Sequence, residues 1–263
     1  MTTDPLMREH DARLSGWTDP VVRMRQALER DEFVLYCQPI AALSGPVRFP
    51  MAEVLVRLHQ EETSLMPPGE FLPVFEHYRM MPALDRWVVR NVVRHMAQGS
   101  RIPHFSINVS SQTIQDASFP GSVAQMIMGS GVPGGSILFE IDETSLLAHP
   151  EDVERFGNAV SAIGCRVMID GFGRRAVTFA PLKRLRVSHV KVDGVIVRKL
   201  LTSGSAERKL LAIVRVAEAI GFGVIAEMVE EQDILTRLKA LDVTHAQGFG
   251  IHQPQPIGKF AAA

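Results

Sequence analysis

The chain has 263 residues, of which 46% are hydrophobic and 22% are charged, and its formal net charge is −1. This apolar content is sufficient for a buried core and excludes a disordered chain. The near balance of 28 basic and 29 acidic residues excludes a chain-wide basic surface, so we expect no DNA partner and a local cluster for any anionic ligand.

The start of the chain, residues 1–17, is polar and mixed in charge, which is not the pattern of a signal peptide. The longest apolar stretch, residues 210–228, is interrupted by charged residues and a glycine and is too broken to span a bilayer. Cys37 and Cys165 each lie inside an apolar run, as expected for core residues in a reducing compartment. These features predict a cytoplasmic protein with no membrane span.

The predicted elements alternate between strands and helices along the chain. Asp19 and Pro20 have the pattern of a helix N-cap followed by the first helical residue. Helix-like stretches lie at residues 20–30, 69–77, 81–96, 122–128, 150–163, 206–220 and 230–241. Runs of strand-forming residues lie at residues 33–37, 52–58, 104–107, 137–139, 166–169, 189–190, 222–226 and 243–246. This order predicts βαβ units and a parallel sheet in an α/β fold.

The glycine-rich segment at residues 129–135 precedes a strand and lacks the spacing of a nucleotide-binding loop, so we interpret it as a turn. We find no internal repeat and no interdomain linker. We therefore expect one barrel domain at residues 20–258, preceded by an arm at residues 1–19 and followed by a tail at residues 259–263.

A polar residue follows each of the later apolar strands, at the point where the run stops. These residues are Asn108, Glu140, Asp170, Lys191, Glu227 and Gln247. In a parallel barrel all carboxyl ends of the strands open onto one face, where catalytic groups collect. Taken singly, each residue is also compatible with a solvated loop position. The repetition is what favours a barrel with a functional site at one end.

Four of the candidate side chains offer only oxygen ligands: Glu53, Asn108, Glu140 and Asp170. Such a set suits Mg²⁺ or Mn²⁺ better than zinc. A hard cation of this kind polarises a phosphoryl oxygen and activates a bound water. Lys191 is suited to neutralise charge or orient that water, and Glu227 to accept its proton.

Nine short motifs, in order over nearly the whole chain, resemble those of the EAL domain family. They are F-V-L-Y-C-Q-P-I at 33–40, E-V-L-V-R at 53–57, P-G-E-F at 68–71, L-D-R-W at 84–87, I-N-V-S at 107–110, F-E-I-D-E at 139–143, V-K-V-D at 190–193, A-E-M-V-E at 226–230 and Q-G-F at 247–249. Each motif alone is weak, and their number and order carry the resemblance.

The resemblance implies a modified TIM (β/α)₈ barrel whose first strand is antiparallel, and hydrolysis of cyclic di-GMP to linear pGpG. It implies metal ligation by the four oxygen-bearing side chains named above and handling of the attacking water by Lys191 and Glu227. It also implies that Glu143 holds the loop after Asp170. The residues that it implies for contact with the nucleotide are Gln38, Glu53, Arg57 and Gln247. Members of the family often form homodimers.

The chain departs from the family pattern at two places. Val54 replaces the signature alanine, and it should face away from the metal because strand neighbours point to opposite sides. In the loop after Asp170, Gly171 replaces an aspartate that would help to bind a second metal ion. We therefore expect one ion site to be retained and the second to be weakened, which should impair turnover more than binding.

Arg174 and Arg175 replace two small residues of the same loop, and two interpretations remain open. The first is a solvated basic loop that covers the neighbouring helix. The second is that one guanidinium replaces the missing cation and pairs with a ligand phosphate.

Three classes of function remain open. The first is a metal-dependent cyclic di-GMP phosphodiesterase, either fully competent or slowed. The second is a binding protein without useful turnover, for cyclic di-GMP or for a protein partner alone. The third is an aldolase-like enzyme with Lys191 as a Schiff base, which nearby carboxylates disfavour because they keep the amine charged. We favour a protein that binds cyclic di-GMP, hydrolyses it poorly or not at all, and is controlled by a signalling partner.

Overall fold

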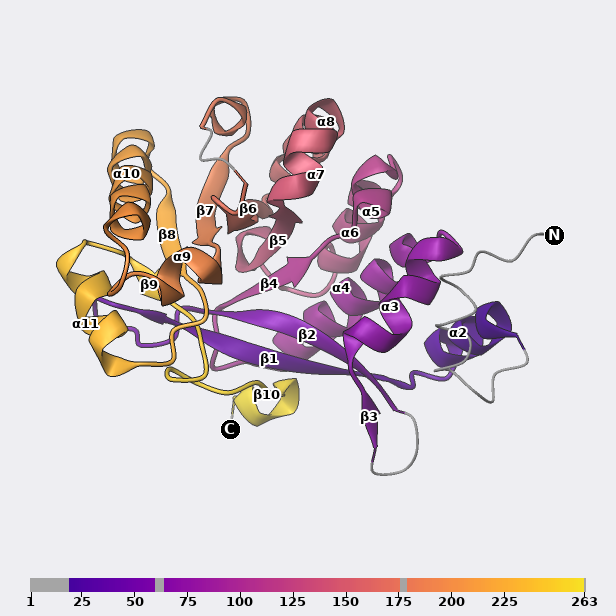
Figure 1. Cartoon of the computed structure of the whole chain (residues 1–263). Helices are drawn as coiled ribbons and strands as arrows, with labels where there is room; N and C mark the ends of the chain where they lie inside the picture. Colours follow the sequence, from indigo (N-terminus) through magenta and orange to yellow (C-terminus); the bar gives the residue numbers. More distant parts are fainter. Residues whose placement is uncertain (1–18, 60–63, 176–178, 263) are drawn as a thin grey trace.

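In the computed structural model, which describes residues 19–59, 64–175 and 179–262, eight strands close into a barrel surrounded by helices (Figure 1). The predicted arm at residues 1–19 falls outside these ranges except for Asp19. The strands of the barrel are β1 (Phe33–Ala42), β2 (Met51–His59), β4 (His104–Asn108), β5 (Ile137–Asp142), β6 (Arg166–Phe172), β7 (Val187–Val192), β8 (Gly223–Ala226) and β9 (His245–Ala246). Two short strands extend the sheet beyond the barrel: β3 (Leu65–Met66) along β2 and β10 (Gln255–Pro256) along β1.

The strand directions confirm the predicted modified TIM barrel. β1 pairs antiparallel with both of its barrel neighbours, β2 and β9. The six remaining junctions, from β2–β4 round to β8–β9, are all parallel. The carboxyl ends of seven strands therefore share one face of the barrel.

Helices cover the outside of the barrel (Figure 1). They are α2 (Pro20–Glu29), α3 (Pro68–His77), α4 (Met81–Ala97), α5 (Ser111–Gln115), α6 (Phe119–Ile127), α7 (Glu143–Ala148), α8 (Pro150–Ala162), α9 (Gly194–Arg198), α10 (Gly204–Ile220) and α11 (Gln232–Ala240), with 3₁₀ turns at Gly134–Ser136, Pro181–Lys183 and Ile257–Phe260. As predicted, the Asp19 carboxylate caps the first helix by accepting the N–H groups of Val21 and Val22. Within the described ranges, no helix combines the length and apolar character that crossing a membrane requires.

A layer of five apolar side chains fills the inside of the barrel and forms a cluster separate from the larger core. It comprises Ile40, Met51, Leu138, Met168 and Ile225. Each of these residues lies two positions in the chain from a polar residue of the predicted site, and side chains two apart in a strand point to the same face. The polar residues are, in the same order, Gln38, Glu53, Glu140, Asp170 and Glu227. The layer therefore closes the barrel beneath the site and leaves the polar side chains at the open end.

The larger core lies between the barrel and its helices. Val54 belongs to it and is 5% exposed, which confirms that this side chain faces away from the barrel interior. Cys37 and Cys165 are buried in the same core with free thiols, as predicted.

The sequence analysis did not predict three short helices, and six strands of the barrel, β1, β2, β4, β5, β6 and β7, are longer than predicted. The helices α5, α7 and α9 have five or six residues each, too few for a recognisable apolar period. Each follows a strand and is capped by a side chain that accepts a backbone N–H: Ser110, Asp142 and Asp193. The strands β5, β6 and β7 continue for one or two residues past Glu140, Asp170 and Lys191, so these residues lie inside strands near their ends and not after them.

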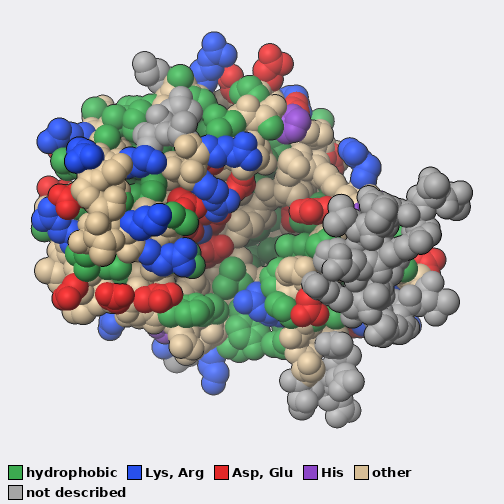
Figure 2. Space-filling view, viewed as in Figure 1, with side chains coloured by type: hydrophobic (Ala, Val, Ile, Leu, Met, Phe, Trp, Pro, Cys, Tyr) green, Lys and Arg blue, Asp and Glu red, His purple; other side chains and the backbone are tan. Residues whose placement is uncertain are grey.

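The space-filling view shows that the face seen in Figure 1 is hollowed near its middle (Figure 2). Acidic side chains are visible on the walls of the hollow, and Lys and Arg side chains gather on one side of it, on the left in this view.

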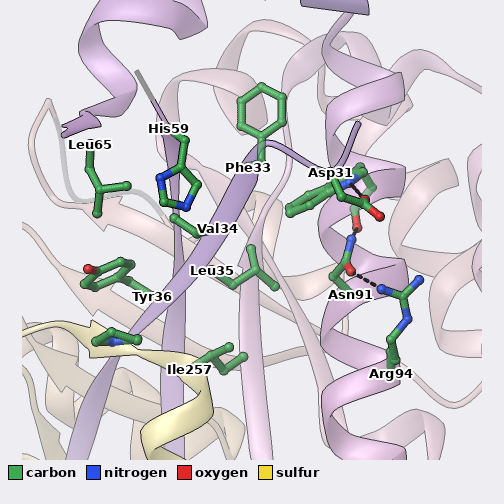
Figure 3. Close-up of a pocket in the computed structure, with 12 residues that line it drawn as sticks. Asp31, Phe33, Val34, Leu35, Tyr36, His59, Leu65, Asn91, Arg94 and Ile257 are labelled. Atoms are coloured by element: carbon green, nitrogen blue, oxygen red, sulfur yellow. Dashed lines mark hydrogen bonds between the residues drawn. The ribbon is translucent and has the colours of Figure 1, made fainter. Parts of the chain in front are cut away.

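A different cavity, of about 560 Å³, lies between β1, α4 and the segment after β10 (Figure 3). Its lining is mainly apolar, and includes Phe33 and Leu35. Two pairs of polar groups at its edge bond to each other, since Trp87 donates to Asp31 and Arg94 donates to Asn91. None of the predicted site residues lines this cavity, so it is a poor candidate for the functional site.

A histidine pair inside the barrel makes the stability of the fold depend on pH. His189 lies two residues before Lys191 on the inner face of β7, and its ring centroid is 5.2 Å from that of His245. Burial, together with the charges of His245, Arg166 and His104, lowers the pKa of His189 to about 3. The folded protein therefore keeps this imidazole neutral at a pH where the unfolded chain protonates it.

We predict that this histidine makes the fold less stable as the pH falls below about 6.5, by about 1 to 2 kcal/mol at pH 5. The measurement is the free energy of unfolding of the wild type and of His189→Gln between pH 8 and pH 5. The stability difference between the two proteins should change with pH by this amount, in the direction that favours the variant at low pH. His149→Gln, which removes an exposed histidine, is the control and should show no such change.

Candidate active site

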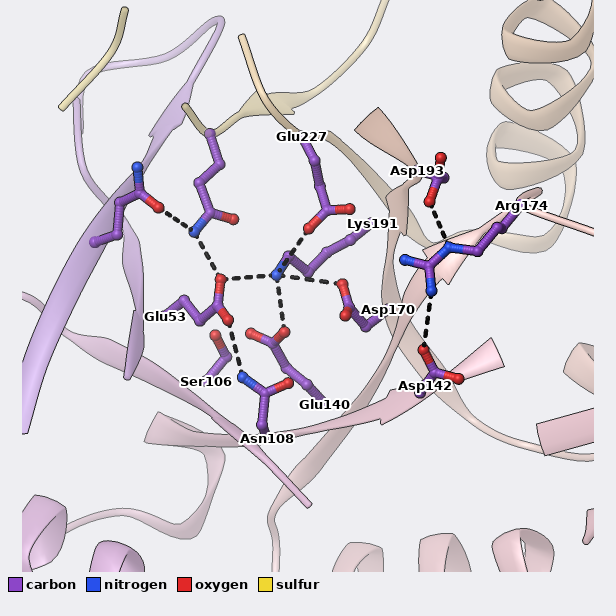
Figure 4. A network of polar contacts seen from close by, with 12 residues as sticks. Glu53, Ser106, Asn108, Glu140, Asp142, Asp170, Arg174, Lys191, Asp193 and Glu227 are labelled. Carbon is purple, nitrogen blue, oxygen red and sulfur yellow. Dashed lines mark hydrogen bonds and ion pairs between the residues drawn. The ribbon is translucent and has the colours of Figure 1, made fainter. Parts of the chain in front are cut away.

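Polar side chains from all eight strands, or from the residues directly after them, meet at the open end of the barrel (Figure 4). They are Gln38, Glu53, Asn108, Glu140, Asp170, Lys191, Glu227 and Gln247. Residues up to 209 positions apart in the chain are in direct contact in this group. The convergence that the sequence pattern predicted is therefore present in the structure.

The ammonium group of Lys191 lies at the centre of this group. It donates hydrogen bonds to Glu53 Oε2 at 2.8 Å and to Glu140 Oε2 at 2.9 Å. It also forms ion pairs with Glu227 Oε1 at 3.2 Å and with Asp170 Oδ1 at 3.3 Å. The Lys191 side chain is only 1% exposed, so one buried cation joins three acidic side chains from strands β2, β5 and β6 and a fourth that directly follows β8.

Amide side chains complete the network on the other side of Glu53. Asn108 donates to Glu53 Oε1 and Gln247 donates to Glu53 Oε2, both at 2.8 Å. Gln247 also donates to Gln38 at 3.2 Å, and Gln38 donates to the backbone carbonyl of His252 at 2.9 Å. These contacts hold the Glu53 carboxylate in one orientation.

The cluster carries more negative than positive charge, because four carboxylates share one ammonium. Burial by itself lowers the pKa of Lys191, but the four carboxylates reverse this and raise it well above its usual value. Burial and the neighbouring Glu53 raise the pKa of Glu140 to about 8. Burial likewise raises the pKa of Glu227 to about 7. The site is therefore short of positive charge at neutral pH, and Lys191 stays protonated, which argues against a Schiff-base role.

The donor set fits a hard divalent cation. Among the described residues, Glu140 Oε1 is buried without a hydrogen-bond donor, and Asp170 Oδ1 is buried and faces the Lys191 ammonium at 3.3 Å, so each retains lone pairs for a further positive group. Carboxylate and amide oxygens are the ligands that Mg²⁺ and Mn²⁺ prefer. The cage itself is not preformed: in the described part of the chain, no three His, Cys, Asp or Glu side chains are arranged to hold an ion. Glu53, Asn108, Glu140 and Asp170 are the residues that would close around one.

Two networks fix the loops beside the cluster. Asp85, which is 4% exposed, accepts the backbone N–H and the hydroxyl of Ser110 and the hydroxyl of Thr113, and thereby anchors the chain after Asn108. Glu143, which is 3% exposed, accepts the backbone N–H of Gly173 at 2.9 Å and that of Arg175 at 3.3 Å. The Glu143 carboxylate is therefore in contact with the loop after Asp170, where the resemblance placed it.

The two arginines of this loop differ in their surroundings. The Arg174 guanidinium donates to Asp193 Oδ2 at 2.7 Å and lies 3.8 Å from Asp142 Oδ2. The Arg175 side chain is exposed, and its backbone N–H makes the contact with Glu143. Both side chains are exposed, so the interpretation as a solvated basic loop stays open for both, and Arg174 differs from Arg175 in having two acidic partners.

The structure leaves Arg57 outside the hydrogen-bonded cluster. It lies four residues after Glu53 on the same face of β2, donates to the backbone carbonyl of Val56 and stacks over Tyr36 at 5.8 Å. Its guanidinium is thus at the rim, a short distance along the strand from the polar centre.

Sequence reasoning missed two apolar residues that belong to the site. A pocket of about 180 Å³ beside Glu53 and Glu227 is bordered by Met228 and Phe249, which are 45% and 62% exposed. The only signal that could have found them is their position, since each follows a predicted site residue by one or two places. Asp142 and Asp193 were also missed, because a short helix cap leaves no periodic pattern.

The chain matches the EAL domain family over residues 21–254. It is 29% identical over 238 residues to cyclic di-GMP phosphodiesterase PdeF of Escherichia coli (strain K12). The aligned region covers 89% of this chain and 32% of that protein. The chain thus spans about a third of the length of this relative. The solved structure titled PaMucR phosphodiesterase, c-di-GMP complex, is 26% identical, with a TM-score of 0.82 and coverage of 91% of this chain and 98% of that one. The fold of the FimX EAL domain from Pseudomonas aeruginosa bound to c-di-GMP is also similar (24% identity, TM-score 0.85, 93% and 100% coverage).

We predict that Glu143→Ala loosens the loop after Asp170. Removing the carboxylate leaves the N–H groups of Gly173 and Arg175 without their acceptor, and hydrogen bonds to charged groups contribute about 1.5–3 kcal/mol. Hydrogen exchange at these two amides should therefore become about 10- to 100-fold faster. Glu151→Gln, on the exposed side of α8, is the control, and equal exchange rates in both variants would contradict the prediction.

Proposed function

The chain belongs to the EAL domain family, and from this we propose that it binds cyclic di-GMP at the open end of the barrel and hydrolyses it to pGpG slowly or not at all. The observation that carries the proposal is the contact network around Lys191, which joins six of the residues that the resemblance assigned to metal ligation and catalysis. The names of PdeF and of the PaMucR complex support the ligand and the reaction class.

The geometry offers complementary contacts for each part of a cyclic dinucleotide. The acidic centre, with a bound cation, suits the phosphates, while the exposed ring of Phe249 and the Met228 side chain offer an apolar surface to a guanine base. The amides of Gln38 and Gln247 face the same pocket and are suited to the polar edge of the base. Arg57 at the rim adds a fixed positive charge.

A divalent ion held by Glu53, Asn108, Glu140 and Asp170 would polarise a phosphoryl oxygen and make a bound water more acidic. Lys191, whose side chain is 1% exposed, would keep those carboxylates together. Glu227 is 20% exposed and its Oε1 lies 3.2 Å from Lys191 Nζ, beside the residues that would hold the ion, so it is suited to take the proton of the attacking water. As the water oxygen bonds to phosphorus, the bond from phosphorus to the ribose 3′ oxygen breaks, and that oxygen takes up a proton to give pGpG.

The loop after Asp170 is the reason to propose impaired turnover. Gly171 supplies no oxygen ligand at the position where the family pattern has a second aspartate. Because phosphodiester hydrolysis depends on charge stabilisation, the loss of one metal ligand would slow it by about 10²–10⁴-fold. Binding depends on more contacts and should be affected less. A fully competent phosphodiesterase is the second candidate, favoured by the intact network around Lys191.

We also propose that the protein acts in the cytoplasm, where its two free, buried thiols would remain reduced. Control by a separate signalling protein and formation of a homodimer are further proposals that follow from the resemblance.

We predict that the protein binds cyclic di-GMP in calorimetric titrations and that pGpG forms slowly or not at all with Mg²⁺ and then with Mn²⁺, as followed by chromatography. Rapid formation of pGpG would show a competent enzyme and contradict the proposal. Absence of binding would instead indicate a module for protein interaction only.

The location of the binding site is tested with one matched pair of variants. Phe249→Ala should weaken binding by about 10-fold, because stacking of one base contributes about 1–3 kcal/mol. Met128→Ala removes another exposed apolar side chain, at the end of the outer helix α6, and should leave the affinity unchanged.

A further inference from the structure

The Arg174 guanidinium occupies the space directly beside Gly171. A Cβ atom added to Gly171 would lie 3.0 Å from Arg174 Nη2 and 3.3 Å from its Cζ. Gly171 also has a φ of +64°, a left-handed conformation that few side chains adopt without strain. A larger residue at position 171 therefore meets both a backbone restraint and the arginine.

Two carboxylates hold the guanidinium in this place, and each is itself fixed. Asp193 accepts from Arg174 Nε through one oxygen and from the N–H of Val195 through the other. Asp142 faces Arg174 Nη1 through one oxygen and accepts the N–H of Thr144 through the other. Because both acids cap helices, they cannot move freely, and the guanidinium is positioned before any ligand arrives.

The same guanidinium remains available to a ligand. The Arg174 side chain is 55% exposed, whereas that of Asp193 is only 6% exposed. Within this ion pair, the arginine is therefore the partner that faces the solvent. Asp170 interacts electrostatically with both Lys191 and Arg174 and lies between them in the close-up view (Figure 4). Arg174 is thus a fixed positive charge at the edge of the acidic centre.

We propose that Arg174 takes the place of a second divalent cation in this site. The guanidinium neutralises Asp142 and Asp193 and excludes a second ion from the space beside Gly171. Its exposed N–H groups donate to a phosphate oxygen of the nucleotide. The phosphate contact rests on the proposed function, whereas the exclusion of the ion does not.

This arrangement couples positions 171 and 174. Restoring the aspartate alone places a carboxylate against the guanidinium, where it forms an ion pair with Arg174 instead of binding an ion. A second ion requires both changes: a carboxylate at position 171 and removal of the arginine.

The first test counts Mn²⁺ ions per chain by calorimetry, with folding checked by circular dichroism. We expect one ion for the wild type, for Gly171→Asp and for Arg174→Thr, and two for the Gly171→Asp/Arg174→Thr double variant. Two ions on Gly171→Asp alone, or only one on the folded double variant, would overturn the proposal.

The second test measures the affinity for cyclic di-GMP. Arg174→Ala should weaken binding by about 10- to 100-fold, as expected for a charge-assisted hydrogen bond, and Arg174→Lys should recover part of the loss. Arg175→Ala, the matched control in the same loop, should have no effect. Equal affinities for Arg174→Ala and Arg175→Ala would contradict the phosphate contact. If the wild type binds no cyclic di-GMP, the proposed function fails, while the ion count still tests the exclusion of the second ion.

Discussion

Burial of the Lys191 ammonium among four carboxylates is the constraint on which the site depends. A buried charge is stable only when it is paired and hydrogen-bonded, and here the partners come from three strands and from the residue directly after a fourth. The barrel can satisfy this requirement because its strand ends converge. The layer of five apolar side chains that includes Ile40 and Ile225 closes the barrel on the side of the site away from its open end. A surrounding with little water strengthens each of these interactions.

The polar centre could be predicted from the sequence because a polar residue stands where each later apolar run stops, and the structure shows that these residues share a face with the inner apolar layer. Glu140 lies two residues after the buried Leu138, and Asp170 lies two after Met168, so an inward apolar residue implies an inward polar one. The setting of Arg174 could not be predicted in this way. It depends on the caps of two short helices, α7 and α9, and on the conformation of Gly171, and none of these leaves a periodic pattern in the sequence.

The site combines two cations with different roles. Lys191 is buried and holds the carboxylates together, whereas Arg174 lies at the edge and is half exposed. One divalent ion would supply the positive charge that the cluster still lacks. This arrangement is the basis of our proposal that the site binds cyclic di-GMP and cleaves it slowly or not at all.

The central claim, that one buried ammonium holds this cluster together, is tested most directly by Lys191→Met, with Lys209→Met as the exposed control. The measurement is the free energy of unfolding in EDTA and in Mn²⁺. We expect Lys191→Met to lose about 3–5 kcal/mol in EDTA, because its removal leaves buried carboxylates unpaired, and to regain part of this loss when Mn²⁺ binds. Equal stability of Lys191→Met and the wild type in EDTA would contradict the account.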